Sequence, residues 1–322
     1  MKILVTSKSF GQYNASAVKL LEDHGFEITY SDTANSTAAD IRRQVKDFDA
    51  LVVGNDPVDA SVIAAADQLK LIHMHGTGLD AIDVEAATKR NIYVANTPGA
   101  NKNAVAELTV LLMLALGRQL SVHIELLKAG EWKRRAGHEL SNSTVGIIGM
   151  GNIGRRVAEL LGGFNVSIIA YDPVADTEWA AKYGVNFLHN HDEIFKQADW
   201  IVLALPLTDK TKRMVNKRTL SLMKPSAYLV NTARGGLVDE AALCQAIEEK
   251  WIAGAAIDTF IDEPPSMDSR IRSSGILMTP HIGATSIETS AMVSQSVAKN
   301  IIDILIHNIT NSAINAEKIN SL

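Results

Sequence analysis

The chain has 322 residues, enough for about two ordinary domains, and its 47% hydrophobic and 21% charged residues are typical of a globular protein rather than a disordered one. A formal net charge of -5 gives no reason to expect a nucleic acid or a membrane surface as partner. The single cysteine, Cys244, excludes an internal disulfide framework, and a start without a leader-like segment predicts a cytoplasmic protein.

Strands and helices alternate over the first 98 residues. Strands are expected at 2–7, 26–32, 50–55, 70–78 and 92–99, and helices at 15–25, 39–48, 59–69 and 83–90. Repeated strand–helix units of this length predict a parallel sheet covered by helices.

The pattern changes after Pro98. Residues 101–130 have helical, strongly apolar spacing over most of their length, which predicts one long helix that serves as a strut or as the interface of a homodimer. A second strand–helix series runs from 143 to 285, and a helical tail begins at Ile287. This order predicts an α/β protein with two doubly wound parallel-sheet domains, one of residues 1–98 and 287–322 and one of residues 99–286 inserted in it.

The strongest motif is "VGIIGMGNIGRRVAELL". Gly149, Gly151 and Gly154 match G-x-G-x-x-G between a predicted strand and a predicted helix, as a dinucleotide-binding turn requires. The first glycine permits the tight turn, the second lets the backbone approach a pyrophosphate, and the third lets the helix pack on the strand. A strand–helix turn without a ligand is the alternative interpretation.

The next strand supports the nucleotide interpretation. The stretch "VSIIAYDP" ends in Asp172, about 20 residues after the glycines, where a carboxylate accepts hydrogen bonds from the adenosine ribose. Like charges about 4 Å apart repel by about 4 kcal/mol at an effective dielectric constant of 20, so this carboxylate disfavours a 2′-phosphate. The sequence therefore predicts NAD rather than NADP as cofactor.

Three later stretches each place a reactive residue after an apolar strand. They are "LVNTARGG", "AAIDTFIDEPP" and "LMTPHIGAT", with Arg234, Glu263 and His281. In a parallel doubly wound sheet the carboxyl ends of the strands open onto one crevice, so we expect the three side chains to meet there. Each one alone is as readily a surface ion pair or a helix cap.

The three residue types suit reduction of a 2-oxo acid. A planar, permanently charged guanidinium holds a carboxylate and polarises a carbonyl. An imidazolium delivers a proton near neutral pH, and a carboxylate behind it favours the charged form. We therefore expect Arg234, His281 and Glu263 to act as clamp, acid/base and partner of the histidine.

From about Asp49 to Ala284 the chain resembles the D-isomer-specific 2-hydroxyacid dehydrogenases, and among them the phosphoglycerate dehydrogenase-like members. The resemblance rests on the order of "GTGLDAIDVEAATKR", "VANTPGANKNAVAELT", "VGIIGMGNIGRRVA", "YDP", "ALPLT", "NTARGGLVDEAAL", "GAAIDTFIDEPP" and "TPHIGA". It implies a dimeric NAD-dependent oxidoreductase of D-2-hydroxy acids, with a Rossmann NAD-binding domain inserted in a flavodoxin-like catalytic domain.

The resemblance also implies individual contacts. Thr77 and Gly78 match the loop whose backbone amides hold the substrate carboxylate, together with Arg234 and His281. For the cofactor it implies Asn152 and Ile153 at the pyrophosphate, Asp172 at the ribose, Leu205 and Pro206 on the adenine side, Thr232, Ala233, Arg234 and Asp258 near the nicotinamide, and Gly283 and Ala284 closing that wall.

The substrate is less well defined. Phosphoglycerate enzymes typically carry arginines near the two strand ends occupied here by Asn55 and Met74, so phosphate binding would need compensating cations. The candidate cations are Lys8, Lys102, Lys133, Arg134 and Arg135. A glyoxylate or hydroxypyruvate reductase, or an enzyme for a larger D-2-hydroxy acid, stays an equal alternative. Glu263 speaks against a formate dehydrogenase, which carries glutamine there.

Histidine pairs at His73/His75 and His189/His191 suggest metal sites, but no cysteine cluster completes them and the expected reaction needs no metal. We therefore expect packing or solvated histidines and no metal. The basic run 131–137 is a solvated turn or a lid for an anionic substrate, supplied by the neighbouring subunit. A non-catalytic NAD-sensing, corepressor-like protein is the rival from another functional class.

Overall fold

The computed structural model describes residues 1–33 and 36–321. The chain divides into two compact units, Met1–Asn101 with Ala284–Leu322 and Lys102–Gly283. The predicted boundaries, 98/99 and 286/287, lie close to these limits. Residues 34, 35 and 322, which belong to the predicted domain of residues 1–98 and 287–322, lie outside the described residues.

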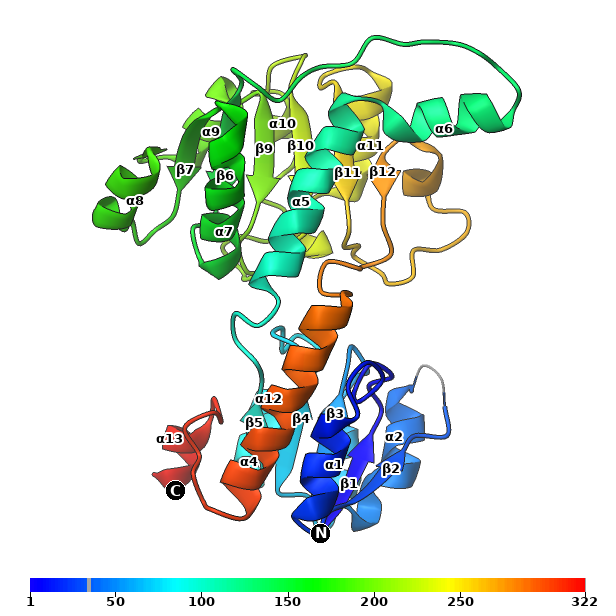
Figure 1. Ribbon diagram of the computed structural model, residues 1–322, viewed down its shortest axis with the longest axis vertical. Helices are drawn as coiled ribbons and strands as arrows, with labels where there is room; N and C mark the ends of the chain where they lie inside the picture. Colours follow the sequence, from blue (N-terminus) through cyan, green and yellow to red (C-terminus); the bar gives the residue numbers. More distant parts are fainter. Residues whose placement is uncertain (34–35, 322) are drawn as a thin grey trace. The chain divides into compact units, whose positions relative to one another are not determined.

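The first unit is built on a parallel sheet of order β2-β1-β3-β4-β5 within the described residues (Figure 1). Its strands are β1 (Lys2–Val5), β2 (Glu27–Tyr30), β3 (Ala50–Val53), β4 (Leu71–Met74) and β5 (Tyr93–Ala95). This is the strand order of flavodoxin-like proteins, as expected.

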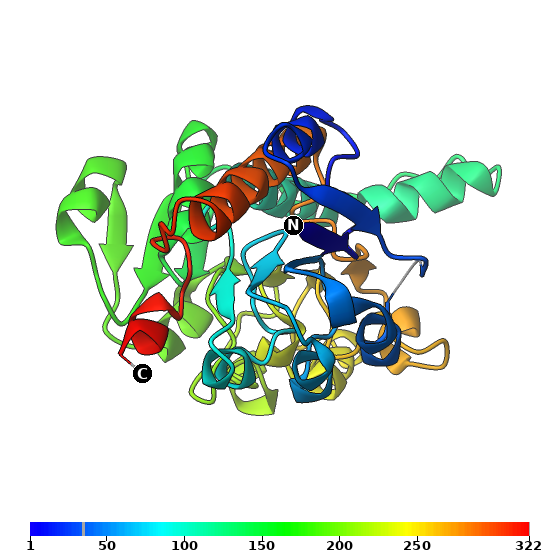
Figure 2. The ribbon, with the colours of Figure 1, turned by 90° about the horizontal axis from the view of Figure 1, so that it is seen from below.

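Alternate residues of β1 serve two helical layers. Ile3 and Val5 pack in the core under α1 (Ser16–Asp23) and α12 (Ile287–Leu305), which lie side by side in Figures 1 and 2. Leu4 packs in the core under α2 (Ala38–Gln44), α3 (Ala60–Ala65) and α4 (Val84–Lys89). The period of two along the strand thus buries both faces of the sheet. The unit also contains the short helices η1 (Val45–Asp47) and α13 (Ala316–Asn320).

The second unit has a parallel sheet of order β12-β11-β10-β9-β6-β7-β8 among the residues described. The strands are β6 (Thr144–Ile148), β7 (Ser167–Tyr171), β8 (Val185–Phe187), β9 (Trp200–Leu203), β10 (Tyr228–Asn231), β11 (Gly254–Ile257) and β12 (Leu277–Met278). The order reverses between β6 and β9, which is the switch point where Rossmann proteins bind dinucleotides. The predicted class, two doubly wound α/β domains, is confirmed.

Helices cover both faces of this second sheet. On one face α5 (Lys102–Gly117), α7 (Asn152–Leu161) and α8 (Thr177–Tyr183) share a core with β6; on the other lie α9 (His191–Gln197), α10 (Lys217–Leu220) and α11 (Glu240–Glu248). The remaining helices are α6 (Leu120–Lys128), η2 (Gly162–Phe164), η3 (Gly235–Leu237) and η4 (Arg270–Ser273).

The prediction of a single long helix over 101–130 is wrong. The helix ends at Gly117, resumes at Leu120 and bends by 61° between α5 and α6. Gly117 lies against the Trp200 ring and His138 O, and Gln119 takes a left-handed conformation with φ 50°. Apolar spacing continues through this break, which is why the sequence pattern did not reveal it.

Among the described residues, no single helix is long and apolar enough to cross a membrane, although the bent pair α5–α6 meets the length and composition limits for one.

Candidate active site

The turn between β6 and α7 carries the three glycines of the dinucleotide motif. Gly149 has φ +97° and lies so close to the backbone of Ala204 that a side chain would collide with it. A Cβ atom on Gly154 would collide with Gly149 O, whereas one on Gly151 would meet no described atom within 4 Å. Gly151 and Asn152 are exposed at the start of α7. The turn thus fits a pyrophosphate: it is tight, packed on the helix side and open at its backbone.

Asp172 lies directly after β7, the strand next to β6. Its Oδ2 accepts a hydrogen bond of 2.7 Å from Met150 N, and its Oδ1 accepts one of 2.9 Å from Val174 N. The carboxylate is therefore fixed beside the glycine turn, where a Rossmann protein places its ribose-binding acid. A cavity beside Asp172 is lined by residues of β7, α8 and β8, among them Phe187, and by His189 in the loop after β8.

Leu205 and Pro206 follow β9, the neighbour of β6 on the other side of the switch point. Leu205 is partly buried against the core of the unit and Pro206 is exposed. The Pro206 carbonyl accepts a hydrogen bond of 2.8 Å from Thr211 Oγ1, which holds the loop after β9. The glycine turn, Asp172 and the Leu205–Pro206 pair thus follow the carboxyl ends of three adjacent strands, β6, β7 and β9.

Arg234, Glu263 and His281 follow three adjacent parallel strands, β10, β11 and β12. Gly235 brings the first two loops together, because a Cβ atom there would collide with the backbone of Phe260. Within the loop after β11, Glu263 Oε1 accepts a hydrogen bond of 3.0 Å from Phe260 N. The strand order therefore positions three chain segments, far apart in sequence, beside one another.

His281 and Glu263 form a direct pair, with 2.6 Å between His281 Nδ1 and Glu263 Oε2. The hydrogen bond to Glu263 raises the pKa of His281, against the opposing effect of burial. Burial would raise the pKa of Glu263, but the hydrogen bonds from His281 and from Phe260 N lower it overall. Both shifts favour an imidazolium facing a carboxylate, which is the charged pair that a general acid requires.

Arg234 lies close enough for its charge to act on both members of this pair. Among the weaker influences, it helps to lower the pKa of Glu263 and opposes the rise in the pKa of His281. Its Nη1 donates a hydrogen bond of 2.8 Å to Ala233 O. Its own carbonyl accepts one of 2.9 Å from Asn231 Nδ2, while Asn231 Oδ1 accepts one of 3.1 Å from Ala233 N. The amide of Asn231 therefore shapes the turn from which the guanidinium extends.

Asp258 holds the turn that carries His281. Its carboxylate accepts hydrogen bonds of 2.6 Å from Thr279 Oγ1, 2.8 Å from Ile282 N and 2.8 Å from Gly283 N, and it has no exposed surface. His281 N also donates to Asp258 O at 2.8 Å, and the histidine has φ 51°. The predicted contact of Asp258 with the nicotinamide stays a prediction, whereas its contacts with the turn were not foreseen.

Thr232 and Ala233 follow β10 directly, and Thr232 is buried with its hydroxyl 2.8 Å from Thr109 Oγ1 of α5. Gly283 is buried and ends the second unit, while Ala284 is exposed and begins the returning segment of the first. Ile153 is partly buried in the first turn of α7.

Thr77 and Gly78, the expected carboxylate loop, follow β4 in the first unit. Asn96 Nδ2 donates a hydrogen bond of 2.7 Å to Thr77 O, and Thr77 Oγ1 donates one of 3.2 Å to Asn101 Oδ1. Thr97 holds Gly76 O through both its amide and its hydroxyl, each at 2.9 Å. Sequence reasoning missed these supporting residues, although "ANTPGAN" follows a strand in the same way as the residues it did select.

The two histidine pairs lie in different surroundings, and over residues 1–33 and 36–321 no group of three or more His, Cys, Asp or Glu side chains that could hold a metal ion is found. His73 is buried, with Nδ1 2.9 Å from Met74 O and Nε2 3.0 Å from Asn300 Nδ2. The nitrogens of His75 lie 3.1 Å from Ser9 Oγ and 2.9 Å from Ser294 Oγ. Burial lowers the pKa of both histidines to about 4, so both are neutral near pH 7 and connect β4 to its neighbours.

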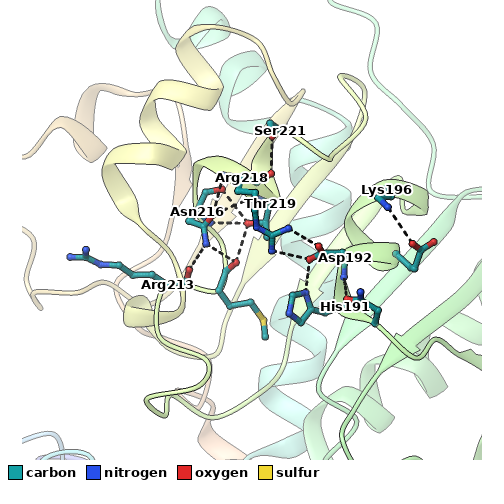
Figure 3. Close-up of polar contacts among 11 residues, drawn as sticks. His191, Asp192, Lys196, Arg213, Asn216, Arg218, Thr219 and Ser221 are labelled. Atoms are coloured by element: carbon teal, nitrogen blue, oxygen red, sulfur yellow. Dashed lines mark hydrogen bonds and ion pairs between the residues drawn. The ribbon is translucent and has the colours of Figure 1, made fainter.

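His191 belongs to an ionic cluster at the start of α9 (Figure 3). Arg218 binds Asp192 with two hydrogen bonds of 2.6 and 3.0 Å, and His191 Nδ1 lies 2.9 Å from Asp192 Oδ1 without the alignment of a hydrogen bond. Arg218 is in α10, so the cluster joins two helices of the second unit. His189 is exposed.

The candidate phosphate-binding cations are exposed. Lys8 follows β1, and Lys102 begins α5. Lys133, Arg134 and Arg135 lie in the segment after α6, which has no regular secondary structure, and Lys133 Nζ pairs with Glu131 Oε2 at 2.5 Å.

Comparison with known proteins identifies the family. The profile of "D-isomer specific 2-hydroxyacid dehydrogenase, NAD binding domain" matches residues 110–283. The D-3-phosphoglycerate dehydrogenase of Methanocaldococcus jannaschii is 39% identical over 322 residues, which cover 99% of this chain. That relative is longer, and this chain spans only 60% of its length. The glyoxylate reductase of Pyrococcus furiosus is 36% identical over 89% of this chain and 88% of its own length.

A solved structure gives the same result. The glyoxylate reductase from "Paecilomyes thermophila" has a TM-score of 0.86 and 28% identity, with 98% of this chain and 99% of that chain covered. The chain therefore belongs to the D-isomer specific 2-hydroxyacid dehydrogenase family, whose profile describes an NAD-binding domain.

Proposed function

We propose that the protein is an NAD-dependent dehydrogenase that interconverts a D-2-hydroxy acid and the corresponding 2-oxo acid. The observation that carries the proposal is the 2.6 Å pair of His281 and Glu263 near Arg234. The three residues follow the carboxyl ends of strands in the same parallel sheet whose strand β6 leads into the glycine turn. NAD, when bound, supplies or accepts the hydride.

The side chains then have separate tasks. Arg234 holds the substrate carboxylate and polarises the carbonyl, because a guanidinium offers a rigid fork of donors. His281 gives a proton to the carbonyl oxygen during reduction and takes it back during oxidation. Glu263 keeps the imidazole charged and oriented through Nδ1, which leaves Nε2 for the substrate. From the family resemblance we also expect the backbone amides of Thr77 and Gly78, in the first unit, to bind a substrate carboxylate.

The names of two relatives suggest two substrate classes, a phosphoglycerate-like acid and a smaller acid such as glyoxylate. Hydroxypyruvate, an alternative from the sequence, belongs to the second class. One observation favours the second class. Met74, which takes the place of an expected arginine, is 4% exposed and packs in the core of the first unit, so its side chain is no ligand for a phosphate. Asn55, at the other such position, is exposed and uncharged.

A panel of acids tests the proposal. Loss of NADH absorbance is followed with glyoxylate, hydroxypyruvate, pyruvate, 3-phosphohydroxypyruvate and larger 2-oxo acids, with the double variant Arg234→Ala/His281→Asn as control for background oxidation. Turnover of at least one acid by the unmodified protein alone supports the proposal. NADH binding without turnover of any acid would instead support a cofactor-sensing, corepressor-like protein.

We also propose that the protein is a homodimer. In Figure 1, α6 extends away from the sheet of its unit, and it has no buried residue. Leu120, Ile124 and Leu127 of α6 are 47%, 43% and 61% exposed, and Trp132 after it is 79% exposed. An apolar strip of this kind is typical of a subunit interface, and a second copy offers the matching strip by symmetry.

We also propose that the protein works in a reducing compartment such as the cytoplasm, which the single, buried Cys244 supports.

A further inference from the structure

We propose that Arg155 is a positioning residue of the cofactor site, which holds the glycine turn in its binding conformation without itself contacting the cofactor. The inference rests on the proposed function only in that the Gly149–Gly154 turn binds NAD. Arg155 belongs to α7 and lies one residue beyond the last glycine of the motif.

Met150, between the first two glycines, is held at both of its backbone polar groups. Its N–H donates a hydrogen bond of 2.7 Å to Asp172 Oδ2, and its carbonyl accepts one of 3.0 Å from Arg155 Nε. Met150 is only 3% exposed, so an unpaired polar group there would be costly. The two side chains thus fix the orientation of the peptide units on either side of Met150.

Arg155 is itself held in place. Its Nη1 donates a hydrogen bond of 2.9 Å to Asp176 Oδ2, and its guanidinium carbon lies 5.1 Å from the centre of the Trp179 ring. Asp176 in turn accepts a hydrogen bond of 3.0 Å from Trp179 N at the start of α8. That backbone bond and the bond from Arg155 lower the pKa of Asp176, so its carboxylate is charged near neutral pH.

One planar group therefore makes three contacts at once: Nε with a carbonyl, Nη1 with a carboxylate and one face with an indole. An ammonium group is a point charge with no plane, so a lysine at this position cannot make the same set. A lysine at position 155 would keep the positive charge but lose these contacts. The Arg155→Lys variant therefore distinguishes positioning of the turn from a general effect of positive charge near the pyrophosphate.

The functional consequence follows from the next residue of the chain. Gly151 directly follows Met150, and a Cβ atom there would meet no described atom within 4 Å. Its amide lies at the start of α7, where a helix offers backbone N–H groups to an anion. Binding a pyrophosphate to a turn already held in place avoids the entropic cost of ordering that turn. Loss of Arg155 should therefore weaken NADH binding while the chemistry of Arg234 and His281 stays intact.

The chain provides a matched control in Arg156. It has the same charge, lies on the same helix and has a similarly exposed side chain, 33% against 34% for Arg155. Its Nη1 donates a hydrogen bond of 3.0 Å to Glu159, further along α7, rather than to the glycine turn. A pure charge effect would act similarly from both positions, whereas a positioning effect is confined to Arg155.

The experiment measures the Kd of NADH by fluorescence titration for Arg155→Met, Arg155→Lys, Arg156→Met and the unmodified protein, with the melting temperature of each free protein as a check of folding. We expect Arg155→Met to raise the Kd about tenfold, as for loss of one charge-assisted hydrogen bond. Arg155→Lys should fall closer to Arg155→Met than to the unmodified protein, and Arg156→Met should change the Kd less than about twofold.

A second measurement keeps the test decisive if Arg155→Met folds poorly. Asp176→Asn leaves the charge of Arg155 and weakens its anchor, while the amide oxygen of asparagine can still accept from Trp179 N at the start of α8. This change should raise the Kd of NADH by a smaller factor and leave kcat at saturating NADH unchanged. Equal effects of Arg155→Met and Arg156→Met, or a normal Kd for Arg155→Lys, would overturn the positioning role alone. Failure of the unmodified protein to bind NADH would overturn the proposed function and this inference together.

Discussion

His281 Nδ1 lies 2.6 Å from Glu263 Oε2, although the two residues belong to loops that follow different strands. Asp258, at the end of β11, ties the His281 turn to the strand that leads to Glu263 by four hydrogen bonds of 2.6 to 2.8 Å. The pair is therefore set by the strand order of the sheet rather than by local sequence. This arrangement raises the pKa of His281 and orients its ring, which supports the proposed role as proton donor and leads to the following expectations.

Replacement of Arg234 should impair binding and turnover together. Arg234→Ala removes both the carboxylate contact and the polarisation of the carbonyl, so KM should rise and kcat should fall. Loss of one preorganised electrostatic donor costs on the order of 3 kcal/mol, or hundreds-fold in rate. Arg234→Lys keeps the charge without the planar fork and should recover only part of the loss. Steady-state kinetics with the best acid of the panel measure both constants; an Arg234→Ala enzyme with normal KM and kcat would remove this residue from the site.

His281 should be tested with His281→Asn. The residue has φ 51°, a left-handed conformation that asparagine tolerates better than alanine, so this change removes the proton donor with the least backbone strain. We expect kcat to fall by roughly 100- to 10,000-fold with little change in KM, because proton transfer contributes mainly to the transition state. His307→Asn, at an exposed position after α12, serves as control. A variant that lost substrate binding but kept kcat would contradict the acid/base role.

Asp172 should determine the choice of cofactor. The unmodified protein should bind NADH well and NADPH poorly, and Asp172→Ser should narrow this gap by removing the charge that repels a 2′-phosphate. Because Asp172 also accepts from Met150 N, the same change should weaken NADH binding about 10- to 100-fold. Fluorescence titration with both cofactors gives the ratio, with Glu178→Ser on α8 as an exposed control. Equal affinity of the unmodified protein for both cofactors would contradict the assignment.

The exposed strip on α6 should control assembly. Ile124→Glu/Leu127→Glu places two charges in the strip and should convert a dimer into a monomer in light scattering at micromolar concentration. Ile309→Glu changes an apolar residue of comparable exposure, 47%, in the other unit and should leave the dimer intact. A monomeric unmodified protein, or a dimer unaffected by the double change, would show that α6 is not the interface.

The sequence predicted the order of elements and the residues at strand ends, because the period of apolar residues and the glycine turns are local signals. It did not reveal the break at Gly117, where contact with Trp200 decides the path of the chain and apolar spacing continues through the bend. It also selected Asp172 for the cofactor alone, whereas the structure adds its bond to Met150 N. Contacts of this kind join segments far apart in the chain, so no local pattern carries them.

The most direct test of the account is the pH profile of kcat/KM for 2-oxo acid reduction by Glu263→Gln beside the unmodified protein. Glu263 raises the pKa of His281, and the protonated imidazole is the form that donates, so reduction is lost as the pH rises through that pKa. In Glu263→Gln the pKa of His281 falls, and the upper limit of activity should move to lower pH. A limit that stays in place, or moves to higher pH, would contradict the pairing of Glu263 with His281.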